Sequence, residues 1–189
     1  MEFGVRTQKR MLRRALAVSA TLLVVAASVA CTTPAPKPTP TPTAIFASED
    51  EALAAATDTY EKYTAAFDEA NSRGGSDMSS LESYVTPEHL ADLNQPGRLE
   101  ENGWHTSGVS TFHVVGLDSV LDDGALVELG LNLCRDISEV RVLSADGTDV
   151  TPADRLNVLP LTVHFVSHET SPERLIVSEI ESWLDNPAC

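Results

Sequence analysis

Three cysteines have the most distinctive chemistry in this chain of 189 residues: Cys31, Cys134 and Cys189. A thiol can be acylated, or it can be oxidised to a disulfide in an oxidising compartment. Cys31 differs from the other two because it directly follows a charge-free apolar segment and precedes alternating Thr and Pro residues. This position predicts a processing site between an export signal and a flexible tether.

The first 30 residues have the layout of a secretory signal peptide. Basic side chains gather between Arg6 and Arg14, and residues 15–30 contain no charge. This apolar run is shorter than the roughly 20 residues that a bilayer-spanning helix needs. Small residues at its end complete a cleavable signal. We therefore expect residues 1–30 to be removed on export, from a start at Met1 or Met11, and the mature protein to be extracytoplasmic.

Ser28-Val29-Ala30-Cys31 resembles a bacterial lipobox, in which the cysteine is lipidated and the chain is cut just before it. The resemblance implies that lipid on Cys31 anchors the protein to the outer face of the cell membrane, since two or more acyl chains anchor stably. Ser28 stands where lipoboxes usually have Leu or Val. Ser28 and Ala30 also fit ordinary signal peptidase, and Cys31 would then begin a soluble secreted protein.

Residues 31–45 are predicted to be a tether, and residues 46–189 a single domain. The repeated prolines prevent a helix or a strand ladder and favour extended polyproline II. We interpret this segment as a linker, with a Pro-rich ligand as the alternative. The rest of the chain is long enough for one ordinary domain with its own core.

If Cys31 is lipidated, Cys134 and Cys189 remain as a pair. In an oxidising compartment such a pair usually forms a disulfide, which would attach the C-terminal residue to a central strand. The alternative is two separate free thiols.

The charge of the mature part excludes one class of partner. The whole chain has 13 basic and 28 acidic residues, and removal of residues 1–30 takes away five basic residues and Glu2, which leaves a net charge of −19. Such a chain repels phosphate backbones and anionic lipid surfaces. We predict no nucleic-acid binding and interpret the acidic residues mainly as a solvated surface.

The N-terminal half of the domain is predicted to be helical. Ser48 and Glu51 form a capping box, and Gly74-Gly75 ends the helix that follows. Its apolar stripe consists of Leu53, Ala56, Tyr60, Tyr63, Phe67 and Ala70. Shorter helices are expected at residues 79–84 and from Thr86-Pro87 onward.

The C-terminal half has the period of strands. Strands are expected at residues 109–121, 125–133, 139–143, 157–168 and 174–184, with Asp122-Asp123-Gly124 as a hairpin turn. Because the helices precede the strands, the fold class is predicted to be α+β with an antiparallel sheet.

The order of a long N-terminal helix, two short helices and a bent antiparallel sheet resembles the nuclear-transport-factor-two-like fold over residues 46–185, and cystatin-like folds are similar too. The resemblance implies a curved sheet of four to six strands around the long helix, with a cone-shaped pocket. With lipobox Cys31, its Thr/Pro tether and an acidic domain ending in Trp183 and Cys189, the chain also resembles small surface lipoproteins of actinobacteria.

The resemblance makes five aromatic side chains candidates for the pocket wall: Tyr60, Tyr63, Phe67, Trp104 and Trp183. This fold hosts isomerases and cyclases as well as binding modules, so the fold alone does not settle the function. An isomerase-type site needs an acid or base that faces a polarising donor. Its candidates are Tyr60, Tyr63, Trp104, His113 and Asp136, but Tyr60 and Tyr63 are better interpreted as core residues, and no catalytic residue is assigned.

The histidines and aspartates do not have metal-binding spacing. His164 and His168 would share one face of a strand about 13 Å apart, which is too far for one ion. Asp118, Asp122 and Asp123 lack the spacing of a calcium loop. We predict no metal and no cofactor.

The resulting expectation is a non-enzymatic surface lipoprotein. It would bind a small apolar ligand in the cone, or a protein partner through the open face of the sheet, where a homodimer could also form. The alternative is a secreted isomerase- or cyclase-like enzyme that uses the same pocket, and a third hypothesis is an envelope assembly subunit. A polar, acid-containing pocket would favour the enzyme, whereas a filled cone would favour an interaction protein.

Overall fold

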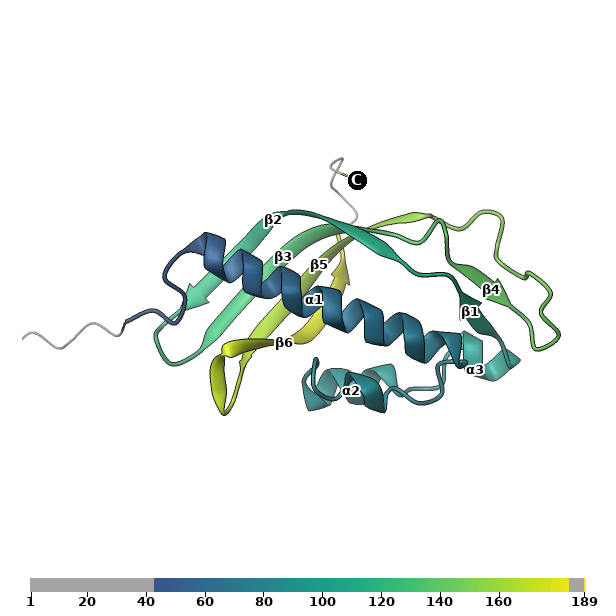
Figure 1. Cartoon of the computed structure of the whole chain (residues 1–189), viewed down its shortest axis with the longest axis horizontal. Helices are drawn as coiled ribbons and strands as arrows, with labels where there is room; N and C mark the ends of the chain where they lie inside the picture. The colour runs from purple at the N-terminus through teal and green to yellow at the C-terminus, as the bar shows by residue number, and fades with distance from the viewer. Residues whose placement is uncertain (1–42, 184–188) are drawn as a thin grey trace, which may run out of the picture. The chain divides into compact units, whose positions relative to one another are not determined.

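A computed structural model describes residues 43–183 and Cys189, and it confirms the predicted α+β class. A long helix and three short helical segments precede all six strands of the described chain (Figure 1). The predicted signal peptide, Cys31 and most of the tether lie outside the described residues. No described helix is long and apolar enough to cross a membrane.

The long helix α1 (Glu49–Ser72) begins at the predicted cap. Ser48 Oγ accepts the Glu51 backbone N–H at 3.2 Å, and the Glu51 carboxylate accepts the Ala47 N–H at 2.8 Å. These bonds satisfy N–H groups that the first helical turn leaves unpaired. The helix ends just before Gly74, whose φ of 99° suits glycine. Most of the predicted stripe is buried, with Leu53 and Phe67 partly buried.

The short helical segments are η1 (Ser79–Leu81), α2 (Pro87–Leu93) and α3 (Arg98–Asn102). Thr86 Oγ1 accepts the His89 N–H at 3.2 Å and caps α2 at the predicted position. The segment predicted as a helix at residues 79–84 is a single 3-10 turn. Helix α3 was not predicted, because the sequence indicates only the turn at Gly103 that ends it.

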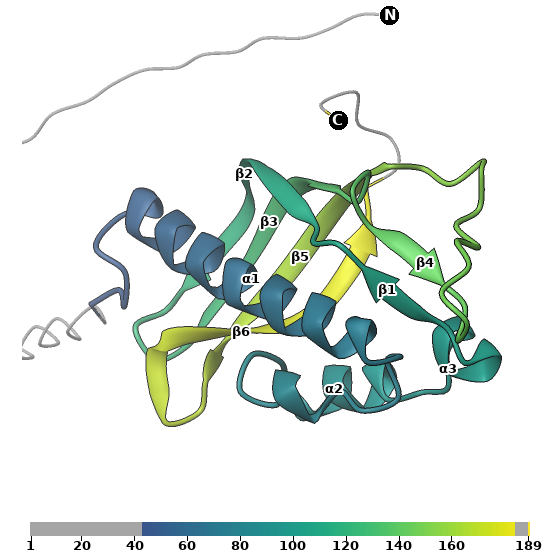
Figure 2. The ribbon, with the colours of Figure 1, turned by 45° about the vertical axis from the view of Figure 1, so that its right-hand side comes forward.

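Four antiparallel strands form the main sheet in the order β2-β3-β5-β6. Their bounds are β2 (Thr111–Asp122), β3 (Val127–Asp136), β5 (Val158–His168) and β6 (Ser171–Ser182). Irregular register at Val114/Gly116 and at Leu117/Ser119 interrupts the β2 ladder, and such bulges bend a strand. Helix α1 lies across one face of this sheet (Figure 2). We call this the inner face and the opposite one the outer face.

Two short strands form a second sheet instead of extending the first. They are β1 (His105–Ser107) and β4 (Arg141–Leu143), and they pair antiparallel. The six strands are therefore divided between a four-stranded and a two-stranded sheet. Strand β1 was not predicted, since three residues are too few to show a period of two.

Hydrogen bonds and a disulfide attach the two ends of the described chain to the sheet. The Asp122 carboxylate, at the end of β2, accepts the N–H groups of Ile45 and Phe46, each at 2.9 Å. These bonds lower the pKa of Asp122. A disulfide joins Cys134 on β3 to Cys189, which is the pair that the sequence singles out. The C-terminal residue is thus attached to an interior strand of the sheet.

Candidate functional site

Side chains fill the space between α1 and the inner face, where the fold resemblance implies a pocket. Tyr60 and Tyr63 are 0% and 2% exposed. The Tyr60 ring meets the edge of Phe112 at a centroid distance of 4.9 Å and lies 5.8 Å from the Tyr63 ring. The sheet contributes buried apolar side chains to the same cluster, including Leu129, Leu131, Leu133, Val163 and Phe165. These two pocket candidates are therefore core residues.

The electrostatics of the two tyrosines fit a core role. Burial raises the pKa of both phenols, and the neighbouring Tyr60 raises that of Tyr63 further. Both therefore remain protonated at neutral pH. Tyr60 Oη is buried without a hydrogen-bond partner of good geometry among the described residues. An isomerase-type donor would need a facing acid or base, and Tyr60 instead faces aromatic rings.

Phe67 is partly buried and belongs to a polar junction at the C-terminal half of α1. Its ring stacks on Tyr63 at 5.7 Å, and the Arg135 guanidinium lies 5.1 Å from the Phe67 centroid. Arg135 donates to the Asp68 carboxylate at 2.7 Å and to Ser110 Oγ at 3.0 Å. The Ser110 N–H and hydroxyl donate to the other Asp68 oxygen. This junction joins α1 to β3 and to the segment before β2.

A cleft of about 590 Å³ lies beside this junction, between α1 and residues 108–112. Glu61, Asp68 and Glu69 line it, as do Val109 and Ser110. Asp68 is the best candidate for a catalytic carboxylate in this cleft, but both of its oxygens already accept hydrogen bonds. The cleft therefore offers an acidic surface and no unengaged buried base.

The two tryptophans lie apart from the α1 rings. Trp104 lines a shallow cleft of about 500 Å³ with Arg73, Glu100 and His105, at the end of α1. Trp183 follows β6, and its backbone N–H donates to the Pro160 carbonyl at 2.9 Å. Ring contacts among the described residues join Tyr60, Tyr63 and Phe67 but include neither tryptophan. The five pocket candidates thus do not form one wall.

The polar candidates for an enzyme site are also dispersed. His113 is exposed on β2, opposite Cys134 in the register. Asp136 accepts the Ser138 N–H at 2.8 Å, and its bonds to Ser138 lower its pKa. His113 pairs with Cys134 and Asp136 lies two residues further along β3, so both lie on the outer face, opposite to Tyr60 and Tyr63.

His164 and His168 occupy different surroundings on β5. His164 Nε2 lies 3.6 Å from a Glu181 carboxylate oxygen, whereas His168 Nδ1 contacts Thr170 in the following turn. Among residues 43–183 and Cys189, no group of three or more metal-binding side chains gathers.

The outer face has an arrangement that the sequence did not reveal. Strand pairing aligns Leu121, Glu128, Val166 and Ile176 in one row across all four strands. The next row contains Ser119, Gly130, His164 and Glu179, and the third contains Gly116, Asn132, Thr162 and Glu181. Within this face, Thr162 donates to Asn132 at 2.7 Å, and Asn132 donates to Asp118 at 3.3 Å. The alternation of side chains along β3 is visible in the sequence. Only the strand register shows which residues of the other strands lie beside them.

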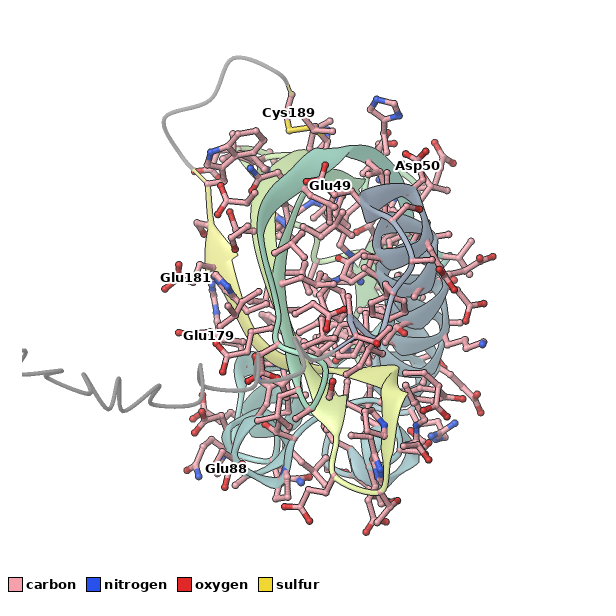
Figure 3. All side chains as sticks on the ribbon, turned by 90° about the vertical axis from the view of Figure 1, so that its left-hand side faces the viewer. Glu49, Asp50, Glu88, Glu179, Glu181 and Cys189 are labelled. Atoms are coloured by element: carbon pink, nitrogen blue, oxygen red, sulfur yellow. A yellow bond between two sulfur atoms is a disulfide. The ribbon has the colours of Figure 1, made fainter. Side chains whose placement is uncertain are left out.

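The acidic side chains of this face have few local cations to neutralise them. Most basic side chains of the domain bind elsewhere within it. Lys62, Arg73, Arg135 and Arg141 pair with carboxylates of Asp58, Glu69, Asp68 and Asp149. Arg155 and Arg174 donate to backbone carbonyls of Ile137 and Ser83. Figure 3 shows Glu179 and Glu181 on the side of the sheet away from α1, with Glu88 on the same side.

Comparison with known proteins adds no relative from which a function could be transferred. The chain matches no known family model and no curated protein.

Proposed function

We propose that this chain is a lipid-anchored, extracytoplasmic protein without enzymatic activity, which acts by binding a protein partner. The observation that supports this most is the filled space between α1 and the inner face. A small apolar ligand needs a cavity of roughly 300 Å³ or more, and Tyr60, Tyr63 and Phe165 occupy that place at 2% exposure or less. The space under α1 therefore offers no such cavity, and binding has to use the surface or its clefts.

The arrangement of polar side chains supports a binding role over catalysis. A general base must reach the proton that it removes and must be free to accept it. Asp68 is already engaged by Arg135 and Ser110, and His113 and Asp136 lie on the opposite face of the sheet from Tyr60 and Tyr63. No specific observation favours the isomerase- or cyclase-like alternative.

The outer face is the surface that best suits a protein partner. None of the described helices covers this sheet face (Figure 2), and it presents exposed acidic residues beside apolar ones. A second copy of the chain would bring the same acidic side chains to both sides of a symmetric contact, where like charges repel. We therefore favour a different protein over a homodimer.

Native mass spectrometry of the secreted mature chain, purified without denaturant, tests the binding mode. We expect a bare monomer with a mass about 2 Da below the reduced value, because the disulfide removes two hydrogens. A co-purifying apolar molecule that leaves on activation would contradict the proposal. A bare dimer would move the proposal to self-association.

The anchor is tested separately by metabolic labelling with a palmitate analogue. We expect the label on the wild-type protein, its loss in Cys31→Ser, and release of that variant into the medium. Cys189→Ser is the matched control, since it replaces a different cysteine of the same chain and should keep the label. An unlabelled wild-type protein would contradict lipidation and favour ordinary signal peptidase cleavage.

A further inference from the structure

Two neighbouring clefts on the outer side of the domain have one lining residue in common. One of about 690 Å³ lies between the start of α2 and the β5–β6 hairpin, and one of about 470 Å³ lies on the outer face itself. Val166 lines both clefts. We call the two clefts together the outer groove. It is lined by Val85, Pro87, Glu88, Leu121, Glu128, Val166, Ile176 and Glu179.

The floor of the outer groove is apolar except at Glu128, which lies between Leu121 and Val166. Leu121, Val166 and Ile176 belong to the same cross-strand row, so their side chains lie on one face of the sheet. At the α2 end Val85 also lines the groove, although it pairs with Val177 at the edge of β6 and belongs to the core cluster. Leu121 is 60% exposed, whereas Val85 and Ile176 are mostly covered. The groove thus combines a fixed apolar base with an exposed apolar side chain at one end.

Gly130 allows the side chains of Ser119 and Asp118 to pack over the middle of the outer face. A Cβ at this position would lie 3.0 Å from Ser119 Oγ and 3.2 Å from Asp118 Cβ, which is closer than most Cβ contacts. Gly130 lies between Ser119 and His164 in the second row. Gly130 is buried under these two side chains, so Asp118 and Ser119 form the surface at this point of the outer face.

The rim of the outer groove is acidic. Glu128 and Glu179 are exposed on the sheet side, and Glu82, Glu88 and Glu169 are exposed around the α2 side. The basic lining groups are His164, His168 and Arg174, and the Arg174 guanidinium donates to the Ser83 carbonyl at 2.6 Å. An acidic rim attracts a cationic partner and repels anionic ones.

We propose that the outer groove binds a basic amphipathic segment of the partner protein, with Lys or Arg side chains on the rim and apolar side chains on the floor. The inference rests on the proposed interaction function and specifies its surface and the chemistry of its partner. The acidic rim provides charge complementarity, and the floor provides apolar contact that a purely charged segment could not use. Both features are needed, so charge alone does not define the partner.

Titration with synthetic peptides tests this chemistry on the full mature protein in non-ionic detergent. The probe is a 12-residue peptide of alternating Lys and Val, labelled for fluorescence anisotropy. One comparison peptide has Glu for Lys, and another has Ser for Val. We expect the Lys-Val peptide to bind at least about tenfold more tightly than either, a difference that corresponds to roughly 1.4 kcal/mol. Equal binding of all three, or no saturable binding, would overturn the proposal.

Matched variants locate the site. Glu128→Gln with Glu179→Gln removes two rim charges, and Glu61→Gln with Glu139→Gln removes two exposed charges elsewhere. We expect the first pair to weaken binding about tenfold and the second about twofold or less, because screening reduces the effect of distant charges. Val166→Thr, similar in shape, should weaken binding several-fold. Equal losses in the two double variants would mean binding by overall charge and would overturn the groove.

Site-specific photo-crosslinking separates this proposal from the proposed function. A photoreactive residue is placed at Ser178, beside the outer groove, or at Ser72, beside the cleft on α1. A protein cross-link from position 178 and not from 72 in the native envelope supports the groove. A cross-link from position 72 alone would keep the interaction function and overturn the groove. Co-purification of an apolar ligand, with no cross-link from either position, would overturn both.

Discussion

The two faces of the four-stranded sheet are stabilised in different ways. The inner face packs Leu131, Val163 and Phe165 under α1 at 1% exposure or less. On the outer face, Gly130, Asn132 and Cys134 of the same strand β3 are also buried, but by polar contacts and a disulfide instead of a helix. The inner face thus depends on apolar packing, and the outer face on a few specific bonds.

This difference indicates how the domain divides stability from function. Burial of large apolar side chains is a major favourable contribution to folding, so the inner face cannot change without loss of stability. On the outer face, the stabilising bonds involve Asn132, Thr162 and Cys134. Glu128 and Glu179 take no part in these bonds and remain exposed. A protein can therefore present a binding surface on one side of a sheet whose other side forms the core.

Removal of the disulfide should have the largest effect on the outer face. The double variant Cys134→Ala with Cys189→Ala opens a loop with a sequence separation of 55 residues. The chain-entropy model predicts a loss of about 4 kcal/mol in the free energy of unfolding, measured by urea denaturation. Cys31→Ser should leave that free energy unchanged. If reduction of the disulfide in the wild-type protein changes the free energy of unfolding by less than about 1 kcal/mol, the disulfide does not stabilise this face.

Truncation on the inner face should cost nearly as much. Leu131→Ala creates a cavity under α1, and we expect a loss of about 3 to 4 kcal/mol in the free energy of unfolding. Glu128→Ala, on the same strand but exposed on the outer face, should change it by about 0.5 kcal/mol or less. Parallel urea titrations give the comparison. Similar losses in the two variants would contradict the division between the faces.

The buried ion pair should matter far more than a surface pair. The side chains of Arg135 and Asp68 are 12% and 13% exposed, and Asp68→Asn leaves the guanidinium without its counter-ion. We expect a loss of about 3 kcal/mol. Asp58→Asn breaks the exposed pair with Lys62 and should cost about 0.5 kcal/mol. A large salt dependence of the Asp68→Asn effect would argue against its buried origin.

The smallest expected effect concerns His89 on α2. Burial lowers its pKa below the ordinary value of 6.5, while Asp92 and Glu179 act in the opposite direction, and the Tyr63 ring lies 6.3 Å away. The unfolded chain therefore binds the proton more readily, so this contribution to stability is present above pH 6.5 and is lost as the pH falls through the folded pKa. His89→Gln should flatten the pH dependence of the free energy of unfolding between pH 7.5 and 5. An unchanged slope would mean that other groups cause it.

Local patterns in the sequence predicted much of the fold. The Ser48 cap and the stripe through Tyr60 and Tyr63 predicted α1, and the Asp122-Asp123-Gly124 turn predicted the β2–β3 hairpin. The α+β class followed from the order of these elements. The sequence did not predict β1 or α3, because elements of three and five residues are too short to show periodicity.

The candidate surface was harder to predict than the fold. The sequence indicated five aromatic pocket residues, but the structure buries Tyr60 and Tyr63 in the core and separates Trp104 and Trp183 from them. The sequence did not indicate the row of Leu121, Glu128, Val166 and Ile176. These residues come from four strands, and their alignment depends on the register and on the bulges in β2.

The sequence by itself determined the acidity of the chain, the long capped helix, the antiparallel hairpins and the α+β class, since each depends on composition or on neighbours a few residues apart. Only the tertiary structure decided that the interior is filled, that Arg135 pairs with Asp68, and that acidic and apolar side chains meet in the outer groove. The physical reason is distance along the chain. Cross-strand register and helix-on-sheet packing join residues dozens of positions apart, and no local pattern encodes which of them will meet.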